Sequence, residues 1–539
     1  MSTEPRQLNG LSRRQFLATA PAWGLAAGCS RSLPAFTGGI VGADATLGHR
    51  FRDGGFAPAN REERVRVLVV GGGISGLVAA RGLLRGGVSD LAVLEIEAEA
   101  GGNSRGGANA VSAYPWGAHY VPLPGPEAIE AAELFREFGV IIGADSRGRP
   151  IYRDEYLCHD PMERLFLHGR WQDGVIPGRG LTVAERGDLD RFLQFTDALK
   201  QSRGTDDRPL FAIPVDRSSA DPTVRALDQL TMESWLDREG YRSEPVRWYV
   251  DYCCRDDFGA GIRRVSAWAG LHYFAARGGL AANAPGHAVV TWPEGNAWLV
   301  NQLREPLGDR IRSRKAVWKV EPQGDRVHVE CWDAAIGEGI RYVAEAVILA
   351  VPRFVAARMM PAAAVGQGGP QYSPWMVANL TLDRLPVGRG VPLAWDNVIY
   401  RSNSLGYVVA THQHLRSVPR ETVLTYYLPL DHLPPAQARQ EAQGRSYVDW
   451  CELVMDDLGR VHPELRSALR QLDVMVWGHG MVTPVPDFVW GPTRAAMARP
   501  VERVHFAHTD VGGISIFEEA CAQGSRAAAA VLDQMGSLA

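Results

Sequence analysis

The sequence predicts an α/β fold in which one domain is assembled from three separated segments of the chain. Residues 65–70 (VRVLVV) are a continuous apolar run, typical of a strand buried on both faces of a sheet, and a glycine-rich turn and a helical pattern follow it. Further strand-like runs of this kind appear much later, at residues 344–352 and 503–510. We therefore expect these segments to belong to one domain, with other material inserted between them.

The other elements can be taken in chain order. Residues 91–95 (LAVLE) complete a strand–turn–helix–strand unit. The pattern from about 125 to 285 is mostly helical, whereas alternating residues between about 370 and 490 predict strands. A helix over 517–535 closes the chain. Residues 30–62 are rich in Gly, Pro, Ala and Arg without periodicity, so we predict a linker there.

Composition is that of a large globular protein. The chain has 539 residues, of which 46% are hydrophobic and 22% charged, which suits a large core and two or more domains. The formal net charge of -4 argues against nucleic acid as the main partner. Histidines and cysteines show no spacing typical of a metal site, so no metal is expected.

The N-terminus carries a pattern typical of an export signal. Arg13 and Arg14 are adjacent, Phe16 and Leu17 follow, and the apolar run after them is too short to span a bilayer. We interpret residues 1–29 as a twin-arginine signal peptide, which predicts the twin-arginine translocase as a partner and a periplasmic location. Cys29 follows LAAG, so the mature protein is either free or a lipoprotein anchored through this cysteine.

The glycine-rich turn matches a dinucleotide-binding pattern. Gly71, Gly73 and Gly76 form G-x-G-x-x-G, with Ile74 and Ser75 between the last two glycines. The first glycine allows a tight turn, the second lets the backbone approach a pyrophosphate, and the third lets helix and strand pack closely. Glu95 ends the second strand at the spacing of a ribose partner. Its carboxylate would repel a 2′-phosphate, which disfavours NADP.

Several other segments resemble the flavin amine oxidase superfamily. They are VLEIEAEAGGNSRGG, YPWGAHYVP, PEGNAWLVNQL, KAVWKVE and VHFAHTDVGGISIFEEACAQGSRAAA, which occur in the superfamily's order. The resemblance implies FAD as the cofactor rather than NAD. It assigns cofactor contacts to Gly102, Asn103, Arg105, Tyr120, Val317, Asp510, Ile516 and Phe517.

The resemblance also implies a domain organisation of the amine oxidase type. A discontinuous, Rossmann-like FAD-binding domain would comprise residues 63–125, 285–370 and 490–539. An α+β substrate-binding domain would comprise residues 126–284 and 371–489. The implied reaction moves a hydride from a C–H bond of a small-molecule substrate to flavin N5, after which dioxygen or a quinone-like carrier reoxidises the flavin.

Two departures from the superfamily pattern leave alternatives open. The strand expected over 375–383 lacks the superfamily's usual lysine, since the chain has only Lys200, Lys315 and Lys319. Ile516 stands where an aromatic ring usually completes an amine cage. A desaturase or isomerase of an apolar substrate is therefore an alternative, as is a non-catalytic exported FAD-binding protein.

Three residues are the candidates for contact with substrate or ring. His119 lies in the stretch that passes beside the ring, and Trp477 and His479 precede the closing motif. His272 and Tyr273 are expected to pack in the core, and Asp256 and Asp257 to form a solvated helix end.

Overall fold

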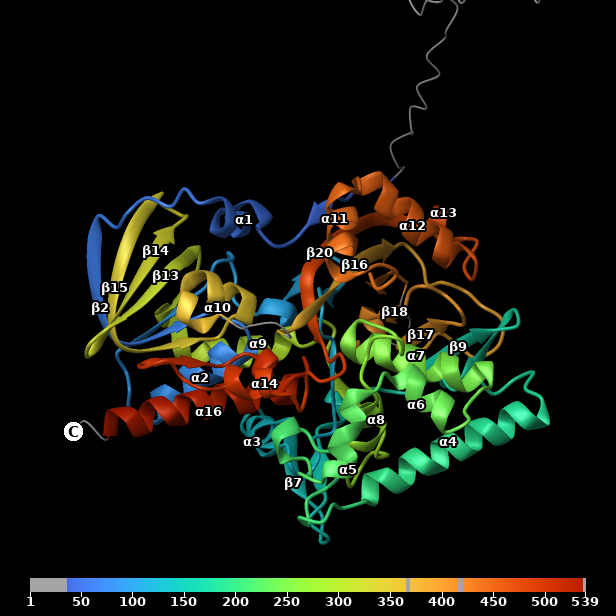
Figure 1. Ribbon diagram of the computed structural model, residues 1–539. Helices are drawn as coiled ribbons and strands as arrows, with labels where there is room; N and C mark the ends of the chain where they lie inside the picture. Colours follow the sequence, from blue (N-terminus) through green and yellow to red (C-terminus); the bar gives the residue numbers. More distant parts are fainter. Residues whose placement is uncertain (1–35, 365–368, 415–419, 537–539) are drawn as a thin grey trace, which may run out of the picture. The chain divides into compact units, whose positions relative to one another are not determined.

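The computed structural model describes residues 36–364, 369–414 and 420–536. The predicted signal peptide, its Arg13 and Arg14, and Cys29 lie outside these residues. The described residues contain two large sheets, which appear on the left and right of Figure 1.

The first sheet has seven strands, and the parts of it that are far apart in the sequence run parallel. Their order is β12 (Ile311–Arg312), β3 (Leu91–Leu94), β2 (Arg61–Val70), β15 (Glu338–Leu349), β14 (Arg326–Asp333) and β13 (Lys315–Gln323), and β21 (Val504–Phe506) also pairs with β15. β12, β3, β2, β15 and β21 are parallel, whereas β14 and β13 form antiparallel pairs. The α/β fold class is therefore confirmed.

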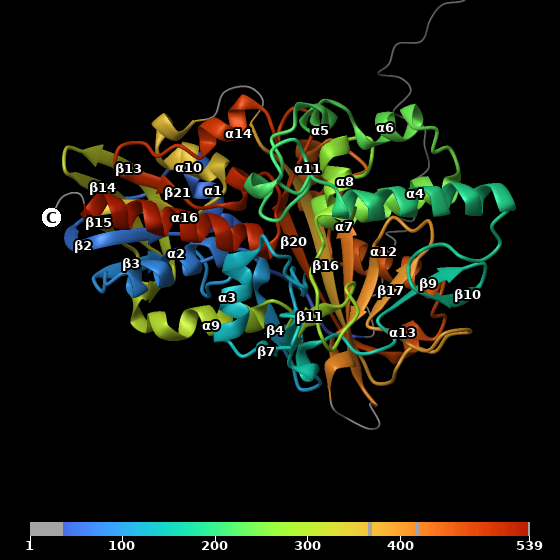
Figure 2. The ribbon, with the colours of Figure 1, turned by 90° about the horizontal axis from the view of Figure 1, so that it is seen from below.

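The apolar run in β2 separates two cores, which explains why it shows no alternation. Val67 and Val69 pack in one core with the helices α2 and α16, while Leu68 and Val70 pack in another with β13, β14 and α10. The helices on the first side are α2 (Ile74–Arg85), α3 (Ile129–Glu137), α9 (Ala297–Arg304) and α16 (Phe517–Gly536), and α10 (Arg353–Met359) lies on the second. α2 and α16 lie side by side (Figure 2).

The second sheet has eight strands, most of them antiparallel. Their order is β1 (Ile40–Val41), β20 (Leu469–Thr483), β16 (Gln371–Leu382), β19 (Thr422–Pro429), β18 (Gly406–Val409), β17 (Asp396–Ile399), β9 (Glu163–Leu167) and β10 (Arg170–Asp173). Trp375 and Val377 of β16 face a core formed with α4 to α8, and Met376 and Ala378 face α11 to α13. Both faces of this sheet are thus covered by helices.

The helices on these two faces come from separate parts of the chain. They are α4 (Val183–Gln201), α5 (Pro222–Arg225), α6 (Met232–Arg238), α7 (Glu244–Phe258) and α8 (Ala267–Ala275) on one face, and α11 (Pro435–Gly444), α12 (Tyr447–Gly459) and α13 (Leu465–Ala468) on the other. The shorter elements are β4 (Gly106–Ala108), β5 (Ala113–Pro115), β6 (Tyr120–Pro122), β7 (Ile141–Ala144), β8 (Pro150–Tyr152), β11 (Val289–Thr291), α14 (Pro492–Met497) and α15 (Thr509–Gly512).

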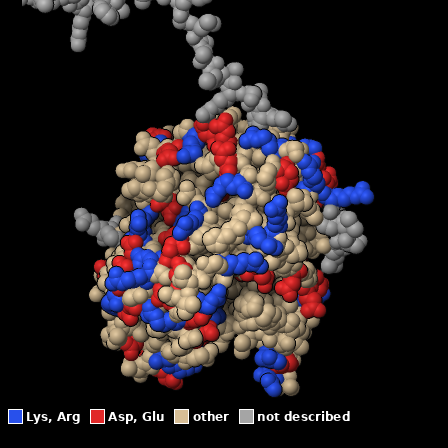
Figure 3. All heavy atoms as spheres, turned by 90° about the vertical axis from the view of Figure 1, so that its right-hand side faces the viewer, with Lys and Arg blue, Asp and Glu red and all other residues tan. Residues whose placement is uncertain are grey.

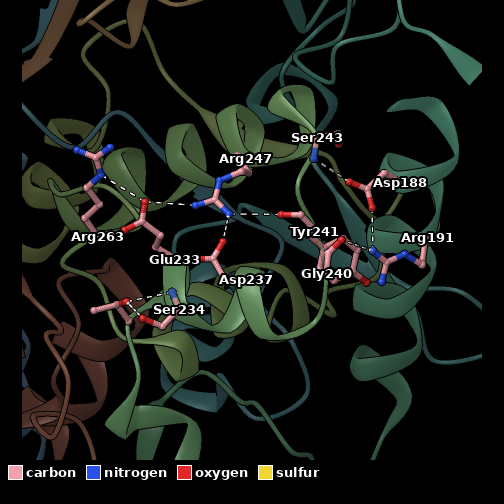
Figure 4. A network of polar contacts seen from close by, with 11 residues as sticks. Asp188, Arg191, Glu233, Ser234, Asp237, Gly240, Tyr241, Ser243, Arg247 and Arg263 are labelled. Atoms are coloured by element: carbon pink, nitrogen blue, oxygen red, sulfur yellow. Dashed lines mark hydrogen bonds and ion pairs between the residues drawn. The ribbon is translucent and has the colours of Figure 1, made fainter. Parts of the chain in front are cut away.

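Polar contacts fix the connection between α6 and α7. Arg247 of α7 donates to the carboxylates of Asp237 (2.7 Å) and Glu233 (3.2 Å) on α6, as Figure 4 shows. Asp188 of α4 accepts from the backbone N–H of Ser243 at 3.1 Å, which ties the start of α7 to α4. Since α7 carries residues of the cavity described below, this network helps to hold one wall of the cavity in place.

Residues 36–62 differ from the predicted linker. They contain β1, which pairs in parallel with β20, and α1 (Ala45–Asp53), which lies beside the first sheet (Figure 1). Neither element shows a long apolar pattern, so the sequence alone does not predict it. Each is stabilised by contacts with distant parts of the chain.

The face shown in Figure 3 carries acidic and basic side chains interspersed with one another. No helix within the described residues combines the length and the apolar character needed to cross a membrane.

The contact between α2 and α16 generates a prediction about stability. A Cβ atom at Gly524 of α16 would lie 2.4 Å from the backbone oxygen of Ser75 in α2. We expect Gly524→Ala to force the helices apart at a cost of about 1–3 kcal/mol, which a lower midpoint of thermal unfolding would show.

Gly187→Ala is the matched control for this substitution. Gly187 lies inside α4 with no neighbour within 4 Å of a Cβ atom, so alanine there should stabilise the helix by up to about 1 kcal/mol. Equal midpoints for the two variants would contradict the proposed close packing.

Candidate functional site

A cavity of about 1920 Å³ connects the turn after β2 with the helices that cover the second sheet. Fifteen of the seventeen residues predicted for the cofactor or the substrate line it: Gly71, Gly73, Ile74, Ser75, Glu95, Gly102, Asn103, His119, Tyr120, Val317, Trp477, His479, Asp510, Ile516 and Phe517. The structure thus brings together residues that are up to about 450 positions apart in the sequence; their individual roles stay predictions.

The glycine turn has the geometry that a bound nucleotide needs. Gly71 has φ = 104°, and a Cβ atom there would lie 2.5 Å from the backbone oxygen of Ala350. A Cβ atom at Gly76 would lie 1.9 Å from the backbone oxygen of Gly71, so close packing, rather than cavity lining, requires this glycine. Gly73 has no neighbour within 4 Å, and its backbone borders open space. This open cradle fits a pyrophosphate.

Glu95 is held by backbone N–H groups on both carboxylate oxygens. Its Oε2 accepts from Gly72 at 2.7 Å and its Oε1 accepts from Glu97 at 2.9 Å. Burial raises the pKa of Glu95, although both hydrogen bonds oppose this effect. Gly72 was missed in the sequence pattern: a Cβ atom there would collide with Glu95 and Ala100, so this position also needs glycine.

Arg105 departs from the predicted cofactor contact. It does not line the cavity, because its guanidinium lies 3.4 Å from the carboxylate of Glu97 and over the ring of Trp477. Asn103 does line the cavity, and its side-chain amide donates to the backbone oxygen of Gly480. Arg105 therefore contacts Trp477, a residue of the cavity wall, and not the cavity itself.

Asp510 is a fully buried carboxylate with three polar neighbours. Its Oδ2 accepts from the backbone N–H of Arg353 at 2.8 Å and from the hydroxyl of Tyr372, and its Oδ1 lies 2.8 Å from Nδ1 of His508. Burial acts to raise the pKa of Asp510, but His508 and these hydrogen bonds outweigh it and lower the pKa. Asp510 therefore supplies a fixed negative charge beside the start of α16.

An aromatic group surrounds His119. Its ring is stacked on Tyr427 with ring centres 4.6 Å apart, and lies 5.5 Å from Trp395 and 5.0 Å from Tyr120. Burial lowers the pKa of His119 to about 4, so the ring is neutral at physiological pH. Trp477 lies nearby in the second sheet and donates from Nε1 to the backbone oxygen of Trp116 at 2.7 Å.

His479 faces a different part of the cavity. Its ring is stacked on Phe354 at 4.3 Å and meets the edge of Tyr372. Burial, with the neighbouring Arg439 and Arg358, lowers the pKa of His479 to about 4. His119 and His479 therefore belong to separate groups of side chains, although both line the cavity.

The prediction that Asp256 and Asp257 form a solvated helix end is wrong. Both line the cavity at the C-terminal end of α7. Asp256 accepts from the hydroxyl of Tyr120 at 3.2 Å, and Asp257 pairs with Arg277 at 2.5 Å. α7 is buried because its own apolar side chains, among them Cys254 and Phe258, pack in one core with Trp375 and Val377 of the second sheet.

Two more carboxylates complete this acidic recess, which consists of Asp256, Asp257, Glu163 and Asp396. Burial and the charge of Asp257 raise the pKa of Asp256 to about 7. Burial also raises the pKa of Glu163, and burial together with Glu163 raises that of Asp396 well above its usual range. One signal in the sequence could have indicated the acidic recess: Tyr249, Tyr252 and Asp256 recur at helical spacing and share one face of α7.

Other expectations concern His272, Tyr273 and the lysines. His272 is buried in the core, as predicted, with Nε2 2.8 Å from the backbone oxygen of Ala212, whereas Tyr273 borders the cavity. β16 contains no lysine, and Trp375 at its start lines the cavity. Within the described residues, no group of three or more His, Cys, Asp or Glu side chains is placed to hold a metal ion.

Comparison with known proteins agrees with this geometry. The family model for flavin-containing amine oxidoreductases matches residues 74–532. The flavin-containing amine oxidase B of Bos taurus is 23% identical over 498 residues, covering 88% of this chain and 87% of its own length. That of Sus scrofa is 26% identical over 331 residues, covering 60% of this chain and 55% of its own length.

Solved structures show the same fold. Cyclohexylamine oxidase from Brevibacterium oxydans matches 88% of this chain and 99% of its own with a TM-score of 0.62 and 17% identity. Wild-type putrescine oxidase bound to putrescine gives a TM-score of 0.61 at 15% identity, over 88% of this chain and 100% of its own. A fatty acid isomerase from P. acnes gives 0.58 at 15% identity, over 86% and 97%.

The fold and the site define an FAD-dependent oxidoreductase. The chain belongs to the flavin-containing amine oxidoreductase family. The expected superfamily and cofactor are thereby confirmed, and an enzymatic role replaces the alternative of a non-catalytic protein.

The contacts of Glu95 lead to a prediction about cofactor affinity. In Glu95→Gln the side-chain N–H₂ would face one of the two backbone N–H groups, so one hydrogen bond to the carboxylate would be lost. Hydrogen bonds to a charged group are worth about 1.5–3 kcal/mol. We expect the Kd for FAD to rise at least about tenfold, measured by titrating the apoprotein and following flavin fluorescence.

Glu99→Gln provides the comparison, since Glu99 is exposed four residues further on. An unchanged Kd in Glu95→Gln, or an equal increase in both variants, would contradict the role of Glu95.

Proposed function

We propose that this oxidoreductase acts on a small-molecule amine that enters the cavity as an ammonium ion. The observation that carries the proposal is the acidic recess beside the aromatic group of His119. Its four carboxylates face one cation, Arg277, which already pairs with Asp257. A positively charged substrate would lower the free energy of these buried carboxylates.

FAD, when bound, would supply the hydride acceptor for this oxidation, with dioxygen or a quinone-like carrier as the final electron acceptor. The protein's own residues orient the amine. Tyr427, Trp395 and the neutral His119 provide aromatic surfaces against which an ammonium ion is favourable. Because the imidazole of His119 is neutral at physiological pH, it does not repel a positively charged substrate.

Asp256 is the residue proposed to accept the proton of the substrate. Amine oxidation requires a free nitrogen lone pair, so the ammonium proton leaves before the hydride departs from the adjacent carbon. Asp256 lines the cavity, and Tyr120 orients its carboxylate by donating to Oδ2. A pKa of about 7 lets this carboxylate take a proton and return it near neutral pH. In this proposal Asp256 takes over a role for which β16 offers no lysine.

The charge of the recess also bears on the alternative of an isomerase or desaturase. A fatty acid carries a carboxylate, which the ionised carboxylates of the acidic recess would repel, whereas an ammonium ion would favour their ionised form. The apolar part of the cavity wall remains compatible with a neutral apolar substrate. Anaerobic flavin bleaching by a panel of amines, fatty acids and neutral isoprenoids, with product analysis for isomerisation because that reaction leaves the flavin oxidised, separates these substrates. Turnover only of the last two would overturn the proposal.

Asp256→Asn tests the role of this carboxylate. With an amine that bleaches the wild-type flavin, the rate of anaerobic reduction should rise with pH through about 7, because Asp256 then loses its own proton. The variant should be about 10²-fold slower at pH 7. Its rate should recover only near the pKa of the free amine, at about pH 10.

Asp190→Asn serves as the control, because Asp190 is exposed on α4. An Asp256→Asn variant that keeps the wild-type pH profile would refute the role of Asp256 as proton acceptor. FAD content measured in parallel separates this outcome from loss of the cofactor.

We further propose that residues 1–29 direct export of the folded, FAD-loaded protein through the twin-arginine route. Because FAD is acquired in the cytosol, folding before export suits a flavoprotein. In Arg13→Lys/Arg14→Lys the protein should stay in the cytoplasmic fraction, whereas the unaltered chain should reach the periplasm, as cell fractionation and immunoblotting would show. Equal export of the unaltered chain and of the Arg13→Lys/Arg14→Lys variant would contradict the proposal.

Metabolic labelling with a fatty acid tests the lipid anchor. A label that enters the unaltered chain but not Cys29→Ser would show that Cys29 carries the lipid.

A further inference from the structure

Residues 36–56 form a clasp segment that connects the two sheets and lies outside the part of the chain matched by the family. At its start, the segment joins the second sheet: Ile40 and Val41 pair with Val474 and Met475 of β20. The backbone N–H of Gly39 donates to the carboxylate of Asp473 at 3.2 Å. This first anchor is a backbone pairing with the strand that carries Trp477 and His479.

The other end of the clasp segment docks on the first sheet. Phe56 is stacked on Trp318 of β13 with ring centres 6.0 Å apart, and Arg50 lies over the rings of Phe56 and Trp332. Leu47 of α1 is 6% exposed, so α1 buries apolar surface here. The segment is therefore fixed at two places on two different sheets.

Between its anchors the clasp segment forms a wall of the cavity. Its residues Ile40, Val41, Asp44, Gly48, Phe51 and Arg52 line the same cavity as Gly73, Glu95 and Val317. Ile40 and Val41 remain 51% and 38% exposed, although they are apolar. Lining of a cofactor cavity explains why apolar side chains stay uncovered by other protein groups.

A chain of hydrogen bonds links the clasp segment to the residue predicted to hold the ribose. The backbone N–H of Asp44 donates to Oε1 of Glu97 at 3.0 Å, and the backbone N–H of Glu97 donates to Oε1 of Glu95 at 2.9 Å. Asp44 also caps α1, with its Oδ1 accepting from Leu47, and its Oδ2 lies 3.4 Å from Arg314. The segment therefore contacts the cavity at its adenosine half, where Glu95 and Val317 lie.

We propose that the clasp segment closes the adenosine half of the FAD site and that FAD leaves this protein only when the segment detaches. The cofactor would be retained by two anchors that are independent of its own contacts. Because release requires breaking an anchor, the clasp segment lowers the dissociation rate of FAD more than its contacts alone would.

The first anchor offers a matched pair of substitutions at adjacent glycines. Gly38 has φ = 140°, and a Cβ atom there would lie 1.9 Å from the backbone oxygen of Leu472. Gly39 has no neighbour within 4 Å of a Cβ atom. Gly38→Ala should therefore push β1 away from β20, whereas Gly39→Ala should leave the pairing intact. Phe56→Ala removes the stacking on Trp318 and tests the second anchor.

The measured quantity is the rate of FAD release from the purified holoprotein, followed by flavin fluorescence after addition of an excess of the apoprotein of another FAD-dependent enzyme as a trap. We expect release to be at least tenfold faster in Gly38→Ala and in Phe56→Ala than in the wild type and in Gly39→Ala. Amide hydrogen exchange in residues 40–52 should be slower in the FAD-loaded protein than in the apoprotein. Equal release rates in all four proteins, or exchange unaffected by FAD, would overturn the proposal.

A second form of the experiment avoids variants that fail to fold. A recognition site for a specific protease can be inserted between Gly54 and Gly55, which are exposed and have no neighbour within 4 Å of a Cβ atom. The protein folds and binds FAD as an intact chain and is cut afterwards. Faster FAD release after cleavage supports the clasp, and unchanged release refutes it. Neither readout needs a substrate, so the result does not depend on the proposed amine oxidation.

Discussion

The backbone between β2 and α2 passes so close to its surroundings that no side chain fits at Gly71 or Gly76. Cβ atoms there would lie 2.5 Å from the oxygen of Ala350 and 1.9 Å from that of Gly71. Gly524 repeats the constraint on the other side, 2.4 Å from the oxygen of Ser75. These contacts join β2, β15, α2 and α16, which come from three distant parts of the sequence. The cavity opens at this junction because the parallel strands end there.

Two strands of the second sheet, β16 and β20, form one wall of the cavity. In β16 and β20, alternate side chains face two separate cores, so both strands are fixed from both faces. Trp375 and Trp477, which are paired across these strands, then border the cavity without freedom to move away. Rigid strands of this kind hold aromatic walls at a constant distance from a cofactor, which is what orientation of a substrate requires.

The part of the fold with a strong local pattern could be predicted from the sequence. The run before Gly71, the glycine turn and Glu95 form a recognisable pattern within about 30 residues of sequence, and the structure has them as expected. The acidic recess could not be predicted in the same way, because Glu163, Asp256 and Asp396 lie on β9, α7 and β17. Asp256 at the end of a polar helix resembles a solvated residue until the sheet that covers it is known. The clasp segment was missed for a related reason: its two-residue strand and its short helix are stabilised by partners more than 250 residues away.

Two carboxylate environments of the site have opposite electrostatic consequences. Asp510 accepts hydrogen bonds from the backbone N–H of Arg353 and from Tyr372 and lies beside His508, and its pKa is lowered in spite of complete burial. In the acidic recess, by contrast, the carboxylates mainly face one another and phenol hydroxyls, and the pKa of Asp256 rises to about 7. A lowered pKa keeps Asp510 ionised near neutral pH. A carboxylate whose protonation changes near neutral pH, as at Asp256, is the kind that the proposed proton transfer needs. In this cavity the donors and charges that surround each carboxylate therefore decide whether it stays ionised or titrates near neutral pH.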